Sequence, residues 1–101
     1  MNSSELEIKW DKLAFIQLQK FISFIEEDSI QTATKVKYEI LKKVNSILEE
    51  PTAFGIDKYK LNNDGNHRYF EMHHLRIAFR KTKKEIKILR VRSAHQEPKF
   101  Y

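Results

Sequence analysis

The sequence predicts an α+β domain: a short N-terminal strand, then a two-helix antiparallel hairpin packed on a mainly antiparallel sheet of four to five strands. Three observations predict this class. Apolar residues repeat at helical spacing before Pro51 and at alternate positions after Gly55. Chain breakers are rare, with two Gly and two Pro, and one of each marks this change of period. The 101 residues, at 12.1 kDa, are enough for one hydrophobic core, so residues 1–101 are expected to form a single domain.

The first half of the chain predicts a strand and two helices. Residues 6–10 alternate apolar and polar side chains, which is typical of a short strand. Apolar residues then lie three or four positions apart over about 10–27, and again over about 29–50. Asp28 and Ser29 can cap the second helix, and Pro51 cannot continue it. These signals predict a helical hairpin.

The second half predicts four strands joined by short turns. We expect them at 57–61, 67–72, 75–80 and 85–92, because apolar and polar residues alternate there. The strongest turn signal is Asn62-Asn63-Asp64-Gly65-Asn66, whose residue types tolerate positive φ or bond to their own backbone. His73-His74 and Lys81–Lys84 supply the two remaining turns.

The last hairpin predicts which side chains share a face of the sheet. A tight turn centred on Thr82-Lys83 would place Phe79 opposite Ile86, Ile77 opposite Ile88 and Leu75 opposite Arg90. We expect this face to carry the helices. The other face would display Arg76, Ala78 and Arg80 beside Lys87, Leu89 and Val91, which makes it cationic but partly apolar.

Charge divides the chain as the period does. The net charge is +5, but residues 1–50 carry a net −2 and residues 51–101 a net +7, with all five Arg and all four His. This asymmetry indicates a polyanionic or acidic partner. Arginine can hold phosphate with two parallel hydrogen bonds, so we expect Arg80, Lys87, Arg90 and Arg92 to contact nucleic acid. The alternative is that Arg76 pairs with Glu71 across the hairpin while Arg80 and Arg92 are only solvated.

Several classes of function and location have no support in the sequence. There is no Cys, which excludes a disulfide framework and a zinc finger. No apolar run approaches the roughly 18 residues that cross a bilayer, and Met1–Glu5 lacks the plan of a secretory signal, so we expect a cytoplasmic protein without membrane contact. No nucleotide-binding loop, nucleophile elbow or pair of catalytic carboxylates is visible, and no cofactor is expected.

The spacing of the histidines predicts no metal-binding motif, but the residues around one histidine indicate acid or base chemistry. His73 and His74 are neighbours that would point to opposite faces of a strand, so no metal site is expected. His95 lies within twelve residues that also hold Arg90, Arg92 and Tyr101. Such a cluster permits RNA cleavage without metal, in which a 2′-hydroxyl is deprotonated, arginine holds the phosphorane and an acid protonates the 5′-oxygen.

The order of elements and motifs resembles the RelE/ParE superfamily of bacterial toxins. The resemblance rests on Pro51-x-x-x-Gly55, Asn66-x-Arg68, the strand Leu75–Phe79, and Ile88-Leu89-Arg90-Val91-Arg92-x-x-His95-x-x-x-Pro98, and it covers nearly the whole chain. It implies the toxin of a type II toxin–antitoxin pair, neutralised by a protein antitoxin encoded beside it. RelE-like members cut mRNA in the ribosomal A site without metal, and ParE-like members poison DNA gyrase.

The resemblance implies catalytic roles for four residues. Arg76 matches the arginine that RelE-like enzymes use on the scissile phosphate, and Arg68 matches a basic residue of the preceding strand. His95 and Tyr101 match the basic or imidazole group and the tyrosine of the C-terminal region. The leading hypothesis is ribosome-dependent mRNA cleavage, in which both arginines hold the phosphate, His95 is the acid or base and Tyr101 assists the 2′-hydroxyl.

Two other hypotheses stay open. A non-enzymatic gyrase poison is favoured by Glu71 and by the single basic residue on the strand of Arg68; it would use the helical hairpin and the C-terminal strand for recognition. The third hypothesis is a residual superfamily member that binds an antitoxin and has little other activity. Under each hypothesis we expect an acidic or amphipathic antitoxin segment that covers Leu89 and Val91 and places carboxylates against the arginines.

Overall fold

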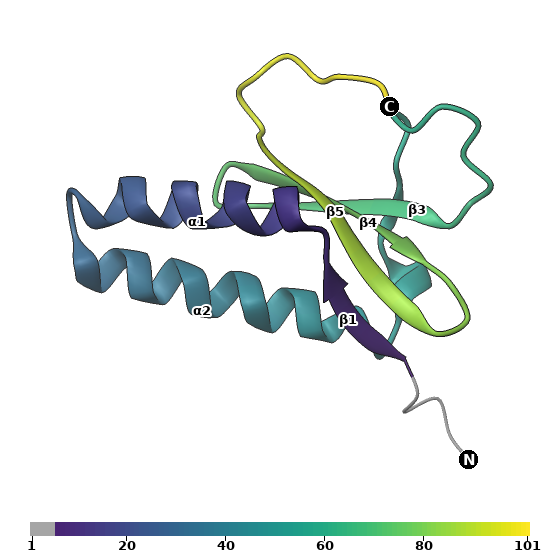
Figure 1. The fold of residues 1–101 in the computed structure, drawn as a ribbon, viewed down its shortest axis with the longest axis horizontal. Coiled ribbons are helices and arrows are strands. Elements are labelled where there is room, and N and C mark those ends of the chain that lie inside the picture. Colours follow the sequence, from purple (N-terminus) through teal and green to yellow (C-terminus); the bar gives the residue numbers. More distant parts are fainter. Residues whose placement is uncertain (1–5) are drawn as a thin grey trace.

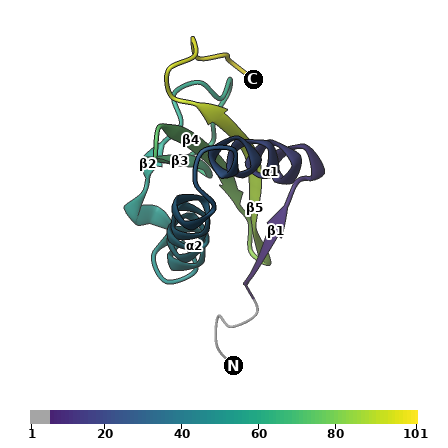
Figure 2. The ribbon, with the colours of Figure 1, turned by 90° about the vertical axis from the view of Figure 1, so that its left-hand side faces the viewer.

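The protein is a two-layer α+β domain, described by a computed structural model over residues 6–101. Its helices are α1 (Lys12–Glu26) and α2 (Ile30–Ser46), followed by the 3₁₀ turn η2 (Pro51–Ala53). Its strands are β1 (Glu7–Trp10), β2 (Gly55–Ile56), β3 (His67–Met72), β4 (Leu75–Lys81) and β5 (Glu85–Ser93). The two helices lie antiparallel (Figure 1) and in front of the sheet (Figure 2). The predicted fold class is confirmed.

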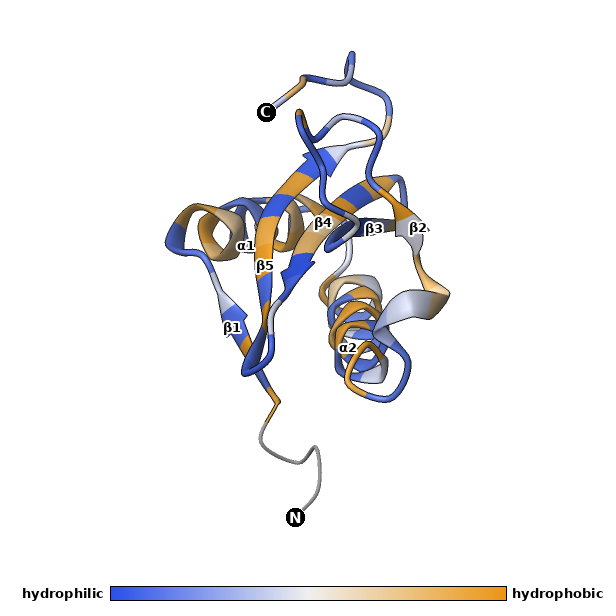
Figure 3. Ribbon diagram, turned by 90° about the vertical axis from the view of Figure 1, so that its right-hand side faces the viewer, coloured by the Kyte–Doolittle hydropathy of each residue, from blue (hydrophilic) through white to orange (hydrophobic). Residues whose placement is uncertain are grey.

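The five strands form one mixed sheet in the order β1-β5-β4-β3-β2. β1 runs parallel to β5, with Glu7 opposite Glu85, and every other neighbouring pair is antiparallel. A parallel partner requires a long connection, and the helical hairpin supplies it between β1 and the rest of the sheet. Figure 3 shows hydrophilic and hydrophobic residues alternating along β4 and β5, as expected for strands with one covered face.

Side-chain caps fix where both helices begin. The Asp11 carboxylate accepts a hydrogen bond from Leu13 N at 3.3 Å, and the Ser29 hydroxyl oxygen accepts one from Thr32 N at 3.1 Å. α2 ends at Ser46, before the predicted limit at residue 50. Beyond Ser46 the main-chain hydrogen bonds join residues three positions apart, such as Ile47 N to Val44 O, instead of the four of an α-helix. A short turn therefore leads into Pro51.

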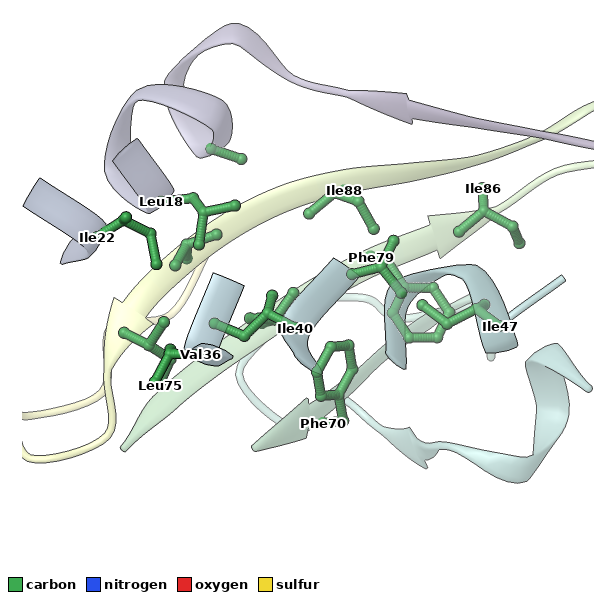
Figure 4. Close-up of a cluster of buried hydrophobic side chains, with 14 of the residues drawn as sticks. Leu18, Ile22, Val36, Ile40, Ile47, Phe70, Leu75, Phe79, Ile86 and Ile88 are labelled. Atoms are coloured by element: carbon green, nitrogen blue, oxygen red, sulfur yellow. The ribbon is translucent and has the colours of Figure 1, made fainter. Parts of the chain in front are cut away.

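The core lies between the helices and the sheet (Figure 4). Its buried side chains come from both helices, including Leu18 and Ile40, and from β3, β4 and β5, including Phe70, Phe79 and Ile88. Burial of large apolar side chains of this kind contributes about 1.5–3 kcal/mol each. Within residues 6–101, no helix is long and apolar enough to cross a membrane.

The predicted strand at 57–61 is wrong. The strand of this region is β2, at Gly55–Ile56, and the chain turns directly after it. The turn forms because the Asp57 carboxylate accepts a hydrogen bond from Tyr59 N at 3.0 Å and the Asp57 carbonyl accepts one from Lys60 N at 3.3 Å.

The predicted register of the β4–β5 hairpin is also wrong. Phe79 lies opposite Ile88, Ile77 opposite Val91 and Leu75 opposite Ser93. Thr82 Oγ1 accepts hydrogen bonds from Lys84 N and Glu85 N, which centres the turn on Lys83-Lys84.

A β-bulge then changes which side chains of β5 face the core. Leu89 is the extra residue, since Phe79 pairs with Ile88 while the adjacent Ala78 pairs with Arg90. As a result Val91 is only 4% exposed and packs in the core, whereas Arg90 lies on the solvent face. Val91 is therefore not part of the surface that the sequence offers to an antitoxin.

Candidate functional site

Arg76 is the centre of a polar cluster on the face of the sheet that the helices leave open. Its Nη2 donates to Asp57 Oδ1 at 2.9 Å and its Nη1 donates to Glu71 Oε2 at 3.3 Å. The guanidinium also stacks 3.6 Å from the centre of the Tyr69 ring and 4.8 Å from that of Tyr59. The pair with Glu71, which the sequence offers as the alternative to phosphate binding, is present; it is the weaker of the two ion pairs because Glu71 is 53% exposed whereas Asp57 is buried.

Asp57 is the anion that organises this cluster. It is 1% exposed, the one buried charged side chain in the described part of the protein. Its carboxylate accepts hydrogen bonds from Arg76, from Tyr59 N and, at 2.7 Å, from the Tyr101 hydroxyl. Burial alone would raise the pKa of Asp57, but the Tyr101 and Tyr59 hydrogen bonds and the Arg76 charge outweigh it and lower this pKa below 3.8.

Residues 94–101, called the tail below, fold back beside the loop that follows β2 (Figure 3). Tyr101 N donates to Tyr59 O at 2.9 Å, and Leu61 N donates to Tyr101 O at 2.6 Å. Phe100 stacks edge-on against Tyr59. The tail is thus attached by main-chain bonds and by an aromatic contact. Burial and the hydrogen bond to Asp57 raise the pKa of the Tyr101 phenol, so it keeps its proton at neutral pH.

Arg90 joins the tail to the sheet. Its Nη1 donates to Lys99 O at 3.0 Å, and its guanidinium lies 4.3 Å from the centre of the Tyr101 ring. Burial and the neighbouring Arg92 lower the pKa of Arg90, which nevertheless stays charged because arginine does not deprotonate in proteins.

A small hollow of about 70 Å³ lies between the tail and the strands. Cationic and acidic side chains share its wall, which includes Arg76, Arg90, Arg92, Lys99, Asp57 and Glu71. The two carboxylates oppose the binding of an anion there, while Arg92 makes no ion pair within residues 6–101 and leaves a net positive rim.

Arg68 lies apart from this cluster. It is opposite Phe79 in the sheet, so its side chain lies on the helix face, whereas Arg76 is opposite Glu71 on the other face. Its guanidinium donates to Phe54 O at 2.7 Å and to Thr52 O at 3.2 Å. Arg68 therefore holds the segment that contains η2. The structure does not bring Arg68 and Arg76 together.

The other expected site residues lie at two further places. His95 is exposed, does not line the hollow, and places Nε2 3.1 Å from Nδ1 of His74. Arg80 and Lys87 are opposite each other nearer the β4–β5 turn, where two like charges face each other across the strands. Arg90 and Arg92 border the hollow.

The sequence does not predict the roles of Asp57 or of the aromatic rings around Arg76. The alternation over residues 57–61 predicts a strand there, and a single Asp in an alternating segment carries no pattern that reveals a buried carboxylate. Tyr59 and Tyr69 lie ten positions apart in the chain, and both rings contact Arg76 because the pairing of β2 with β3 brings the loop after β2 beside the sheet. Within residues 6–101, no group of three or more His, Asp or Glu is arranged to hold a metal ion.

Comparison with known families defines the class of the protein. The family model described as "ParE toxin of type II toxin-antitoxin system, parDE" matches residues 8–98. The chain belongs to this ParE toxin family and is therefore a toxin of the type II toxin–antitoxin class.

Two solved structures share the fold. A structure described as the chromosomal ParDE toxin–antitoxin system from P. aeruginosa has a TM-score of 0.68 and 18% identity, and the match covers 88% of this chain and 96% of that one. The YoeB dimer from Staphylococcus aureus has a TM-score of 0.53 and 23% identity, covering 88% of this chain and 97% of that one. Curated protein sequences give no match.

Proposed function

We propose that this toxin acts without cleaving RNA, by binding and poisoning DNA gyrase as the resemblance to ParE-like toxins implies. The observation that carries the proposal is the engagement of Arg76. Its guanidinium is bound by Asp57 and Glu71 and stacked on Tyr69, so releasing it to a phosphate would break a buried ion pair. Breaking such a pair costs about 3–5 kcal/mol, which is more than one phosphate contact returns.

The other groups expected in RNA cleavage are also committed. The Tyr101 hydroxyl donates to Asp57, and its raised pKa keeps it protonated at neutral pH, so no phenolate is available to take the proton of a 2′-hydroxyl. Arg68 lies on the helix face and binds main-chain carbonyls. Asp57 and Glu71 add negative charge where an RNA phosphate would have to enter.

The helical hairpin offers a surface for a protein target. Phe24 is 71% exposed near the end of α1, and Ile30 is 70% exposed at the start of α2. Both flank the turn between the helices, at the end of the hairpin farthest from the sheet (Figure 1). Exposed aromatic and aliphatic side chains of this kind are typical anchors in protein interfaces.

Ribosome-dependent mRNA cleavage is the second candidate, and one observation favours it. His95 is exposed, and Arg90 and Arg92 border the nearby hollow on the open face. An imidazole and arginines in one region can still combine an acid or base with phosphate contacts.

One set of assays separates the two candidates. Purified toxin is added to gyrase with relaxed plasmid and, in parallel, to ribosomes translating a defined mRNA. We expect loss of supercoiling and accumulation of cleaved plasmid, with intact mRNA. Cleaved mRNA together with normal supercoiling would overturn the proposal.

Matched variants extend the test to the residues. Phe24→Ser should weaken gyrase inhibition by at least about tenfold, since a buried aromatic anchor is worth about 2 kcal/mol or more. The control is Lys20→Ser, a change at an exposed polar position of the same helix. His95→Ala should leave growth inhibition in cells intact; a nontoxic but folded His95→Ala protein would favour mRNA cleavage instead.

A further inference from the structure

The structure brings two histidines together that the sequence keeps apart. His74 is the second residue of the β3–β4 turn, and His95 follows β5 by two positions. His95 Nε2 lies 3.1 Å from His74 Nδ1, and the ring centroids are 4.8 Å apart. Both side chains are exposed, so the space around these two nitrogens is open to solvent.

The backbones that carry the two imidazoles are fixed. Ala94 N donates to His74 O at 2.7 Å, and His95 N donates to the Ser93 hydroxyl oxygen at 3.1 Å. The turn places His73 at φ 53° and His74 at φ 65°, a left-handed conformation that Asn and Gly adopt at lower cost. The two rings therefore start from tethered positions, and little conformational entropy is lost when a ligand binds both.

The two distances agree with the geometry of one shared metal ion. Imidazole nitrogens bind such ions at about 2.0–2.1 Å, so an angle of roughly 90–110° at the metal separates the nitrogens by about 2.9–3.4 Å. With each ring centroid about 1.1 Å behind its nitrogen, the same arrangement separates the centroids by about 4.5–5.2 Å. The observed 3.1 Å and 4.8 Å both fall within these ranges.

We propose that His74 Nδ1 and His95 Nε2 form a binding site for a divalent transition-metal ion, with Cu²⁺ bound more tightly than Ni²⁺ or Zn²⁺. Imidazole suits all three ions, and the Irving–Williams order ranks Cu²⁺ highest. Within residues 6–101 no third protein ligand joins the two histidines, so water completes the coordination and the affinity is micromolar.

When an ion binds at this site, two metal–nitrogen bonds replace the hydrogen bond between the imidazole rings. The two rings together neither gain nor lose a proton. The hydrogen bond between the rings requires one of the two facing nitrogens to carry a proton. When the ion binds, that proton moves to the outer nitrogen of the same ring, and both facing nitrogens donate lone pairs to the ion. The ion then links the tail to the β3–β4 turn. This role does not depend on whether the target of the toxin is gyrase or the ribosome.

The test uses the full chain without an affinity tag and follows binding of CuCl₂, NiCl₂ or ZnCl₂ by calorimetry. His74→Asn is the first variant, because Asn tolerates positive φ and preserves the turn. His95→Ala is the second. His73→Asn is the matched control at the adjacent turn position, where the imidazole pairs with Glu39 at 2.7 Å.

We expect micromolar Cu²⁺ binding to the wild-type protein, at least tenfold weaker binding to His74→Asn and to His95→Ala, and unchanged binding to His73→Asn. Cu²⁺ should also broaden the NMR signals of residues 74 and 95 before those of His67. Binding no tighter than millimolar, or equal losses in all three variants, would overturn the proposal.

Discussion

A single buried carboxylate determines what Arg76 can do. Asp57 receives the Arg76 guanidinium, the Tyr101 hydroxyl and the Tyr59 amide, which come from β4, the tail and the loop after β2. A buried ion that is hydrogen-bonded by several groups is stable only while all of them remain. Asp57 thus ties three segments together and keeps the arginine from external anions.

Removing Asp57 should destabilise the fold more than removing the other partner of Arg76. Asp57→Ala leaves the guanidinium and the Tyr101 hydroxyl without their buried acceptor, so we expect the free energy of unfolding to fall by about 3 kcal/mol. The control is Glu71→Ala, which removes a carboxylate that is 53% exposed and should cost less than about 1 kcal/mol. Urea unfolding measures both, and equal losses would contradict this account.

At the scale of residues, the sequence predicts contacts between adjacent strands of a hairpin better than contacts between distant segments of the chain. The contact between Arg76 and Glu71 is one of the two alternatives that the sequence offers, because cross-strand neighbours follow from the His73-His74 turn. The contacts of Arg76 with Asp57 and of Asp57 with Tyr101 span 19 and 44 positions of the chain. No local pattern encodes such long-range partners. Only the structure shows that the guanidinium of Arg76 is already bound by Asp57.

Among the elements, the β-bulge of β5 decides which side chains face the core. Without an extra residue at Leu89, strict alternation would have turned Val91 outward and Arg90 inward. The bulge reverses this and also leaves Val91 N free to donate to the Gln17 side chain at 2.9 Å. It thereby turns Arg90 toward the tail and the hollow.

The bulge can be tested by comparing two neighbouring apolar residues of β5. Val91→Ala should lower the free energy of unfolding by about 2 kcal/mol, because it opens a cavity in the core. Leu89→Ala removes a larger side chain from a half-buried position and should cost less than about 1 kcal/mol. A loss for Val91→Ala no greater than the loss for Leu89→Ala would contradict the bulge, because the register expected from the sequence places both side chains on the open face.

Long periodic elements were predicted well, and short irregular ones were not. Both helices and the three strands β3, β4 and β5 appear within a few residues of their expected bounds, since their periods extend over several turns or pleats. The two-residue strand β2 is followed directly by the turn that the Asp57 carboxylate caps, and the bulge is a one-residue shift of register between Ala78 and Phe79. Such events leave no period in the sequence.

The whole molecule separates its charges between the two halves of the chain. Residues 1–50 supply the helices and β1 with a net charge of −2, and residues 51–101 supply the other four strands and the tail with a net +7. Arg80 and Lys87 keep like charges opposite each other, which costs stability unless an acidic partner neutralises them. We expect the antitoxin to be such a partner.

Binding of the antitoxin should therefore depend on salt. We expect the dissociation constant to rise at least about tenfold between roughly 0.05 M and 0.5 M NaCl, where the Debye length shrinks well below the size of the cationic face. Replacing Arg80 and Lys87 by Ser together should reduce this dependence. A dissociation constant that is insensitive to salt would contradict the electrostatic part of the interaction.

The parallel pairing of β1 with β5 also sets the time at which the toxin can become complete. Gln17 and Val91 are in contact although 74 positions separate them, and β5 is the one strand that pairs with β1 in the described part of the chain. Closing so long a loop is slow, and during synthesis it must wait until β5 has been translated and released from the ribosome. Until then the apolar faces of the helices have no complete sheet to cover them, so the core cannot form before β5 is available.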